Sequence, residues 1–459
     1  MELTIKGNIN YCASIVSIKN IIDLEGCNNI KGTTIFGNHV IVSKDVKIGE
    51  LGIYFPVECR ISDEFLSHNN LFDKPELNRD KTKKGFFSTK GRVRAVKLRG
   101  FVSDGFWIPI QSLSYLFNDY SDKSFFETNM GFKEGDSFDH INGNKVCEKY
   151  FVPCHNGTGN NIKRNEKKSK KRFSKVIDTQ FRFHIDTQLL GRNLDKLKPH
   201  AIYDISQKLH GSSFIVSNLL CKRKLTLKDK IAKVFGVNVK EVEYDSLYAS
   251  RKVIKNADLC KNQSGYYSED IWGKVNEELK PFLQQGMTIY GEVVGYLSDG
   301  KMIQKNYDYG CKVGEHKNFI YRITTTLEDG HVIEWPMLRV REWCKQNGLN
   351  AVPLLYYGSI KNWFKYNGLD DLDYIDPTNN SDWKNIFMEW LTGVYLEKDC
   401  IEGVVPVGCI SKVPDEGIVI RNDSSLDIEV FKHKSFAFKC AESKQLDSGE
   451  TNIEDNQEA

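Results

Sequence analysis

The sequence lacks the features that most directly mark membrane, secreted and zinc-binding proteins. None of its apolar runs approaches the roughly 20 residues that span a bilayer, and residues 1–11 lack the basic-then-apolar order of a signal peptide. Its 12 cysteines include no Cys-x-x-Cys pair, which favours reduced thiols, although a zinc site assembled from distant cysteines stays open. We expect an intracellular, cytoplasmic protein (host cytoplasm if viral) that is monomeric and does not contact a membrane.

The chain also lacks a strong net charge, which is +3 at pH 7. So small a value neither indicates nor excludes a polyanionic partner, and the position of the charges has to decide. Basic residues cluster in the run Lys167–Arg172, inside a polar stretch that we interpret as a flexible linker. This run is either a solubilising tether or a contact for nucleic acid.

The sequence does contain enough apolar residues for several cores, with 40% hydrophobic and 12% aromatic residues. Short alternating strands and glycine turns occupy residues 1–153 and predict a small β-barrel. We place a basic linker at 154–177 and a larger domain at 178–444, with an insertion at 368–415. The acidic, polar residues 445–459 predict a disordered tail.

Periodicity and capping residues locate individual elements. Alternating apolar residues predict strands at 38–43, 51–56, 92–98, 201–205, 288–294, 318–325 and 417–420. Thr226 and Ser381 are typical N-cap residues, and Gly236 and Gly348 are typical of helix ends. They predict helices over 227–235, 338–346 and about 382–392, so the expected fold class is α+β.

The most informative residue is Lys208, which follows a predicted strand and precedes the turn at His210–Gly211. A lysine in this position can act as a covalent nucleophile toward a phosphate if its amine is neutral. The short motif alone is weak evidence, because a surface lysine beside a turn has the same sequence. It gains weight only from the residues that follow it along the chain.

Later charged residues complete a set suited to phosphate chemistry. Lys432 and Lys434 alternate in a strand-like run and so share a face. Two cations there suit a transferring phosphate and would keep the amine of Lys208 neutral by repulsion. Glu292 and Glu416 could hold a divalent metal, although each alone could equally be a solvated surface group.

Two further residues extend this set toward a nucleotide. Tyr321 lies in the strand-like run 319–323, where it either belongs to the core or stacks on a purine base. Arg251, which Lys252 follows, is either a solvated cation or a contact for phosphate.

In this order the residues resemble the covalent nucleotidyltransferase superfamily of ligases and capping enzymes, and within it the ATP-dependent RNA ligases of the bacteriophage RNA ligase 2 type. The resemblance runs from about 203 to 444, and its stretches are KLHGSS at 208–213, YGE at 290–292 with IQKNYDY at 303–309, and EGIVI at 416–420 with KHK at 432–434. The N-terminal stretches GIYFP at 52–56 and GRVRA at 91–95 resemble the branch typified by the Deinococcus RNA ligase.

The resemblance implies a nucleotidyltransferase domain of ATP-grasp-like antiparallel sheets with helices, preceded by an N-terminal OB-fold β-barrel. It implies that Lys208 forms a lysyl-AMP adduct and that His210 assists the phosphate chemistry. The other implied roles are contact with the nucleotide or the nick for Arg251, ribose or metal binding for Glu292, adenine stacking for Tyr321, metal binding for Glu416, and α-phosphate binding for Lys432 and Lys434. Gln207 and Arg322 depart from the family pattern, which has glutamate and aspartate there, and they bear on base recognition.

The implied function is that of an ATP-dependent RNA ligase that joins a 3′-hydroxyl to a 5′-phosphate, as in nick sealing and RNA repair. The implied cofactors are ATP and Mg²⁺ or Mn²⁺, and the implied partner is a nicked RNA or RNA/DNA duplex. One alternative is a capping-type guanylyltransferase, against which His210 and the lack of a C-terminal OB-fold count. The other is an inactive nucleic-acid-binding relative, because a fold alone does not prove activity.

Overall fold

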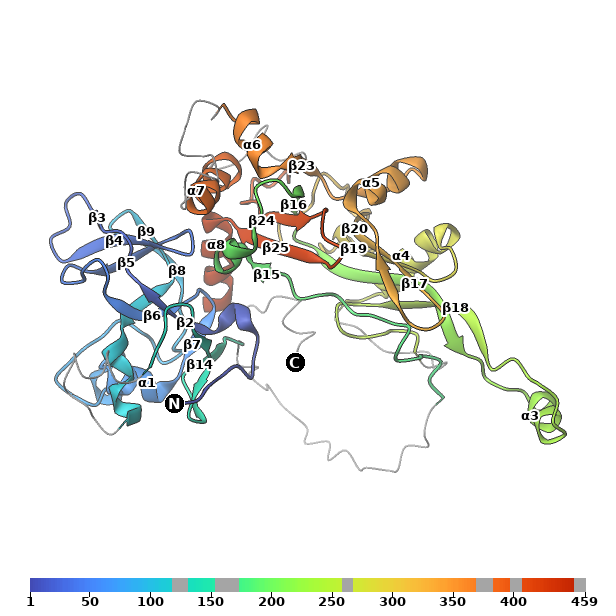
Figure 1. The fold of residues 1–459 in the computed structure, drawn as a ribbon, viewed down its shortest axis with the longest axis horizontal. Coiled ribbons are helices and arrows are strands. Elements are labelled where there is room, and N and C mark those ends of the chain that lie inside the picture. The colour runs from blue at the N-terminus through green and yellow to red at the C-terminus, as the bar shows by residue number, and fades with distance from the viewer. Residues whose placement is uncertain (118–130, 153–172, 258–266, 369–382, 397–406, 450–459) are drawn as a thin grey trace.

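The computed structural model describes residues 1–117, 131–152, 173–257, 267–368, 383–396 and 407–449. Within these ranges an N-terminal part of short strands lies beside a larger part that is built on two longer sheets (Figure 1). The expected α+β class is confirmed. The basic run Lys167–Arg172 and the predicted cap Ser381 lie outside the described residues.

The N-terminal part distributes its strands over several small antiparallel sheets, of which the largest has the order β10-β6-β2-β11. Strand pairings among the described residues do not close into one barrel, so the expected barrel is not confirmed. The elements are β1 (Leu3–Thr4), β2 (Ala13–Ser17), β3 (Ile22–Asp23), β4 (Ile30–Ile35), β5 (Asn38–Ser43), β6 (Leu51–Phe55), β7 (Cys59–Ile61), α1 (Asp63–His68), β8 (Ala95–Leu98), β9 (Phe101–Asp104), β10 (Phe106–Pro109), β11 (Ser137–Phe138), β12 (His140–Ile141), β13 (Asn144–Lys145) and β14 (Cys147–Lys149).

The larger part contains a five-stranded sheet in the order β15-β25-β24-β16-β23 and a six-stranded sheet in the order β18-β17-β19-β20-β21, with β22 beside β20. Apart from the β15–β25 and β20–β22 pairs, the neighbouring strands are antiparallel. The strands are β15 (Gln188–Leu189), β16 (Ile202–Lys208), β17 (Ser212–Lys222), β18 (Val242–Ala249), β19 (Met287–Gly295), β20 (His316–Thr326), β21 (Val332–Glu334), β22 (Asn350–Ala351), β23 (Leu354–Ser359), β24 (Gly417–Asn422) and β25 (Glu429–Lys434).

The helices of the larger part are α3 (Leu227–Val234), α4 (Ile271–Leu279), α5 (Met337–Gln346), α6 (Ile360–Tyr366), α7 (Trp383–Tyr395) and α8 (Phe436–Asp447). The helices predicted near 227–235 and 338–346 are confirmed, and α7 covers the third predicted segment. Helix α8 was not predicted. It continues to Asp447, past the point where the sequence suggests that a disordered tail begins. None of the described helices is long and apolar enough to cross a membrane.

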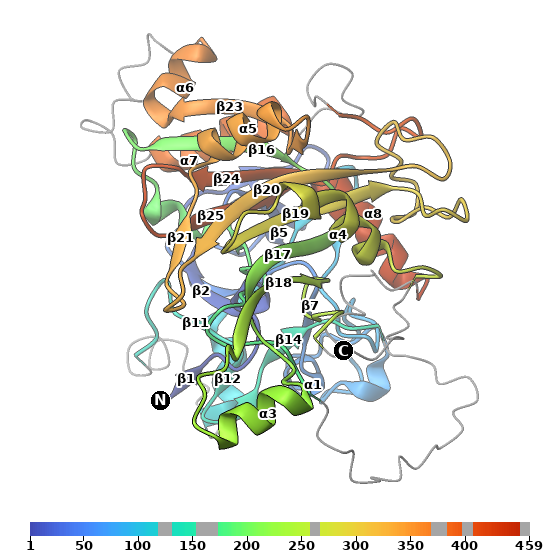
Figure 2. The same cartoon turned by 90° about the vertical axis from the view of Figure 1, so that its right-hand side faces the viewer.

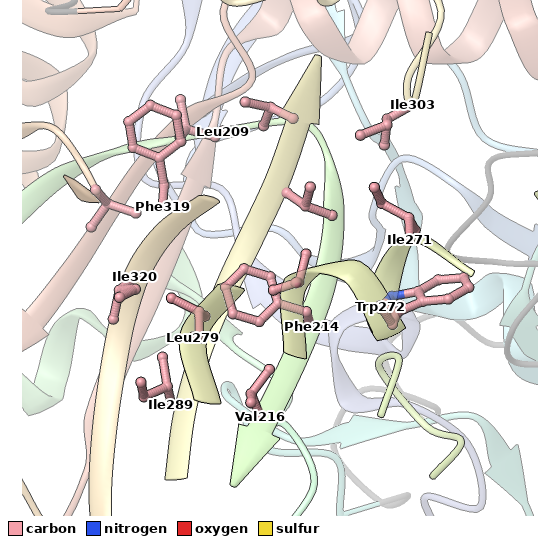
Figure 3. Packing of buried hydrophobic residues seen from close by; sticks show 14 of the residues in the cluster. Leu209, Phe214, Val216, Ile271, Trp272, Leu279, Ile289, Ile303, Phe319 and Ile320 are labelled. Atoms are coloured by element: carbon pink, nitrogen blue, oxygen red, sulfur yellow. The ribbon is translucent and has the colours of Figure 1, made fainter. Parts of the chain in front are cut away.

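The six-stranded sheet is held in place by a large apolar core on the side that α4 covers (Figures 2 and 3). Phe214 of β17, Ile289 of β19 and Ile320 of β20 meet Trp272 and Leu279 of α4, and all are at most 1% exposed. Burial of side chains this large dominates the free energy that fixes neighbouring elements. Strands β17 and β19 are therefore rigid supports for the polar residues on their opposite faces.

Candidate active site

A pocket lies between the two sheets of the larger part, and the N-terminal part contributes to its wall. Of the residues predicted to form a site, only His210 does not line it. Those that do are Lys208, Arg251, Glu292, Tyr321, Glu416, Lys432 and Lys434. Strand pairing thus gathers residues that are spread over more than 200 positions of the sequence.

Lys208 is placed by the register between β16 and β24. It is the last residue of β16 and pairs with Gly417, so its neighbour Glu416 reaches it with an Nζ–Oε1 distance of 2.8 Å. Gly417 has φ of +148°, and a Cβ there would lie 2.2 Å from the carbonyl oxygen of His433. Glycine is therefore required for β24 to lie this close to β25. The Lys208 side chain is 23% exposed and accessible from the pocket.

Two lysines of the site, Lys208 and Lys434, are paired with carboxylates, which differs from the sequence-based expectation. We expected Lys432 and Lys434 to keep the amine of Lys208 neutral, but the ion pair with Glu416 favours the ammonium form. Lys434 lies 3.9 Å from the same carboxylate and 2.9 Å from Glu442. Burial opposes the charge on Lys434, but the nearby glutamates prevail and raise its pKa well above the ordinary value.

His210 lies behind Glu416 rather than in the pocket wall. Its Nδ1 is 3.7 Å from Glu416 Oε2, and its ring meets Tyr307 and Phe438 edge-on at 4.8 and 5.0 Å. Its backbone N–H donates to the hydroxyl of Tyr309 at 2.7 Å. His210 is thus suited to orient Glu416 and does not face the pocket itself.

Glu292 holds the turn that follows the lysine. It pairs with Ser213 across β17 and β19, and its carboxylate accepts hydrogen bonds from Gly211 N at 3.0 Å and Ser213 Oγ at 3.1 Å. A Cβ on Gly211 would lie 2.3 Å from the Val293 carbonyl oxygen, so the turn needs glycine. Gln304 donates to the Gly211 carbonyl at 2.7 Å. Glu292 therefore supports the loop as well as lining the pocket.

Lys432 and Lys434 point into the pocket from one face of β25, as their alternation predicts. Between them, His433 is buried on the opposite face and its Nε2 lies 2.9 Å from Thr392 Oγ1. Burial lowers the pKa of His433 to about 3, so its ring is neutral. The strand thus presents two cations to the pocket and an uncharged face to the protein.

The far end of the pocket carries aromatic and guanidinium groups. The Tyr321 hydroxyl lies 2.8 Å from His184 Nδ1, and Arg251 forms an ion pair with Asp186 at 3.0 Å. Arg322 lies over the ring of Tyr290 at 4.3 Å and pairs with Glu334. At the position where the family pattern has aspartate, this chain therefore has a cation, Arg322. Its charge is neutralised by Glu334.

Several residues of the site were missed from the sequence. Glu58 and Glu442 are buried and line the pocket, and the half-buried Asp415 precedes Glu416 in the chain. Burial raises the pKa of Asp415 to about 7, although a hydrogen bond from Gln207 at 2.9 Å opposes this shift. A local signal existed for Glu442, because Ser435 is a good N-cap for the helix that carries it. No local signal connects Glu58 with the site.

The carboxylates of the pocket suit one hard cation that is bound jointly by them and by the phosphates of a substrate. Among the described residues there is no group of three or more His, Cys, Asp or Glu side chains that could hold a metal ion. Glu416 Oε2 is buried and has no hydrogen-bond partner within that part of the chain. Mg²⁺ is usually held by one or two carboxylates together with substrate phosphates and water. Glu416, with Glu292 nearby in the pocket wall, supplies that kind of donor set.

Comparisons with known proteins place this geometry in a family. Solved structures of the Naegleria gruberi RNA ligase have a similar fold. An apo mutant is 16% identical, with a TM-score of 0.54 over 95% of this chain and 99% of that chain. A mutant with ATP and Mn is 15% identical, with a TM-score of 0.52 over the same shares. The enzyme with PPi is 15% identical, with a TM-score of 0.51 over 93% of this chain and 97% of that chain.

The comparison with curated proteins finds no match. The family model described as RNA ligase matches residues 203–440, which is more than half of the sequence. That range contains every residue predicted for the site, from Lys208 to Lys434. The chain therefore belongs to the RNA ligase family.

Proposed function

We propose that this protein is an ATP-dependent RNA ligase that joins 3′-hydroxyl and 5′-phosphate ends through a lysyl-AMP intermediate. The observation that carries the proposal is the cluster in which Glu416 lies 2.8 Å from Lys208 and 3.9 Å from Lys434. It combines a nucleophile, a metal-binding carboxylate and a cation for phosphate in one pocket. The use of ATP and a divalent metal is supported by the Naegleria gruberi structures with ATP and Mn and with AMP and Mn.

In the first step the amine of Lys208 attacks the α-phosphorus of ATP. A P–N bond forms, the bond from the α-phosphorus to the bridging oxygen breaks, pyrophosphate leaves, and the proton of the amine passes to solvent. Lys432 and Lys434 stabilise the charge on the α-phosphate oxygens as it rises. Tyr321 stacks on adenine, and Arg251 contacts the nucleotide or the nick.

Glu416 controls the charge on the nucleophile. In the ligand-free geometry its carboxylate stabilises the ammonium form of Lys208. Glu416, with Glu292 in the same pocket wall, would hold a divalent cation, which would supply positive charge for the phosphates. Without its pairing to Glu416, the amine of Lys208 would lose its proton more readily. His210 keeps the carboxylate oriented.

In the later steps AMP passes from Lys208 to a 5′-phosphate, and a 3′-hydroxyl attacks that phosphate and displaces AMP. The substrate is a nicked RNA or RNA/DNA duplex, with the 2′-hydroxyl as the discriminator of RNA. The N-terminal residues 1–153, as an OB-fold-like domain of the Deinococcus-like branch, hold the nucleic acid beside the transferase domain at 178–444. The protein acts as a monomer in this proposal.

The proposal is tested with labelled ATP and labelled GTP, followed by sealing of nicked duplexes. We expect a covalent adduct with ATP, and sealing that falls when the 3′ side of the nick becomes DNA. Labelling by GTP alone would favour the capping-type guanylyltransferase. A chain that binds nicked RNA but forms no adduct with either nucleotide would be the inactive relative.

A further inference from the structure

Helix α8 brings a second carboxylate to the lysines of the pocket. Ser435 caps the helix, and its buried residues include Phe438 and Glu442. Glu442 is 7% exposed and lines the pocket, although it follows the last strand of the site. A glutamate this buried needs a partner, because an uncompensated buried charge is costly.

The partner of Glu442 is Lys434. The Nζ of Lys434 lies 2.9 Å from one carboxylate oxygen of Glu442 and 3.2 Å from the other. It also lies 5.1 Å from the centre of the Phe438 ring on the same helix. Burial opposes the charge on Glu442, but Lys434 prevails and lowers its pKa. Helix α8 therefore holds the ammonium group of Lys434 in one position.

The N-terminal part provides the third member of this cluster. Glu58 is 8% exposed, has φ of +67° and hydrogen-bonds to Glu442. This hydrogen bond and the charge of Lys434 both lower the pKa of Glu442. Backbone hydrogen bonds to Val93 and Tyr150 hold Glu58 in the N-terminal part.

The N-terminal part also contacts α8 through Arg92 and Asp104. The Arg92 side chain is 1% exposed, and its Nη2 donates to the Ser443 carbonyl at 2.8 Å and pairs with Asp447 at 2.6 Å. Lys439 pairs with Asp104. Helix α8 thus lies between the N-terminal part and the sheets of the larger part (Figure 1), and its Glu442 lines the pocket. Its position, and with it that of Glu442, depends on contacts with both.

From this geometry we infer that Glu442 is a positioning residue, which orients Lys434 toward the α-phosphate with Glu58 as its support from the N-terminal part. The inference rests on the proposed function and deepens it. Lys434 acts on charge that grows in the transition state, so a loss of orientation lowers kcat more than it raises KM for ATP. If Glu442 had only a structural role, its substitution would lower the stability of the protein without lowering kcat more than it raises KM.

The test measures adenylylation of the full-length chain at several ATP concentrations. We expect Glu442→Gln to reduce kcat roughly 10- to 100-fold, the range typical of residues that orient a site from behind, with KM changed much less. Glu442→Asp keeps the charge and should restore part of the loss. Lys444→Ala, an exposed change on the same helix, is the matched control and should behave as the wild type.

A second variant guards against misfolding of Glu442→Gln. Glu58→Ala should lower kcat in the same direction but by less, and Glu58→Gln should retain more activity than Glu58→Ala because an amide can still donate.

A wild type that forms no adduct would contradict the proposed function itself. An active wild type together with an equally active Glu442→Gln would overturn only the role of Glu442. So would an equal loss in Glu442→Asp and Glu442→Gln, or a loss confined to KM.

Discussion

The two parts of the molecule use β-strands in different ways. In the larger part, β17, β19 and β20 have 9 to 11 residues each and form a continuous sheet over one large core. In the N-terminal part the longest strands, β4 and β5, have 6 residues, and the strands are divided among small sheets. Long strands with a fixed register can carry distant residues to one pocket, whereas short strands mainly shape a surface. The predicted site residues that line the pocket therefore come from the larger part, and the N-terminal part adds a few residues such as Glu58 to the pocket wall.

The largest effect is expected from Lys208→Ala, which removes the proposed nucleophile. No covalent adduct with labelled ATP should form, because the proposal assigns the attacking amine to Lys208. Lys228→Ala on the exposed helix α3 is the control and should label like the wild type. An adduct that survives Lys208→Ala would show that another residue is the nucleophile.

The next effect concerns Glu416→Gln, which keeps the shape of the side chain and removes its charge. We expect the rate of adenylylation to fall roughly 100-fold or more, because the carboxylate that we propose as a metal ligand is lost. The rate should also become less sensitive to the concentration of Mg²⁺ or Mn²⁺. Single-turnover labelling over a range of metal concentrations measures both. If the rate of Glu416→Gln depended on metal concentration as the wild-type rate does, Glu416 would not be a metal ligand.

A matched pair of core substitutions compares the stability of the two parts. Phe214→Ala in the larger part and Phe65→Ala in the N-terminal part each remove a side chain that is 0% exposed. Each should cost about 3–5 kcal/mol of unfolding free energy. If α8 couples the parts, denaturant unfolding followed by fluorescence should shift as one transition in both variants. A second transition that moves in only one variant would show that the parts unfold independently.

The smallest effect is expected at α3. Thr226 and Asp229 form a reciprocal capping box there, and no residue of α3 is buried. Thr226→Ala should cost about 1 kcal/mol of local helix stability and leave adenylylation unchanged. Hydrogen exchange of the α3 amides measures the local helix stability, and ATP labelling measures adenylylation. A loss of adenylylation would mean that α3 contributes to the nucleotide site.

Local patterns predicted much of the larger part. Alternation located β19, β20 and β24, and helix signals located α3 and α5, because these signals lie within a few residues of the elements they describe. The predicted site residues other than His210 line one pocket, and they could be selected in advance because their order along the chain resembles that of a known family. The barrel expected for residues 1–153 was not confirmed, since short strands with glycine turns do not specify how separate sheets join.

The charge state around the nucleophile could not be predicted locally. We expected cations to surround Lys208, whereas its close partner is Glu416, brought there by pairing of β16 with β24. Helix α8 was not predicted, although only its last residues, 445–447, fall in the segment expected to be a disordered tail. Its buried face becomes apparent only against β25 and the N-terminal part.

By itself the sequence determined the features that a few neighbouring residues control. These include the cap of α3, the common face of Lys432 and Lys434, and the glycine turn after Lys208. Backbone geometry and side-chain period specify such features without distant contacts. Only the tertiary structure decided which carboxylate meets which lysine. Glu416 pairs with Lys208, and Glu442 pairs with Lys434. The reason is physical: the energy of an ion pair depends on distance and burial, and both are set by strand register and by the packing of α8 between the two parts.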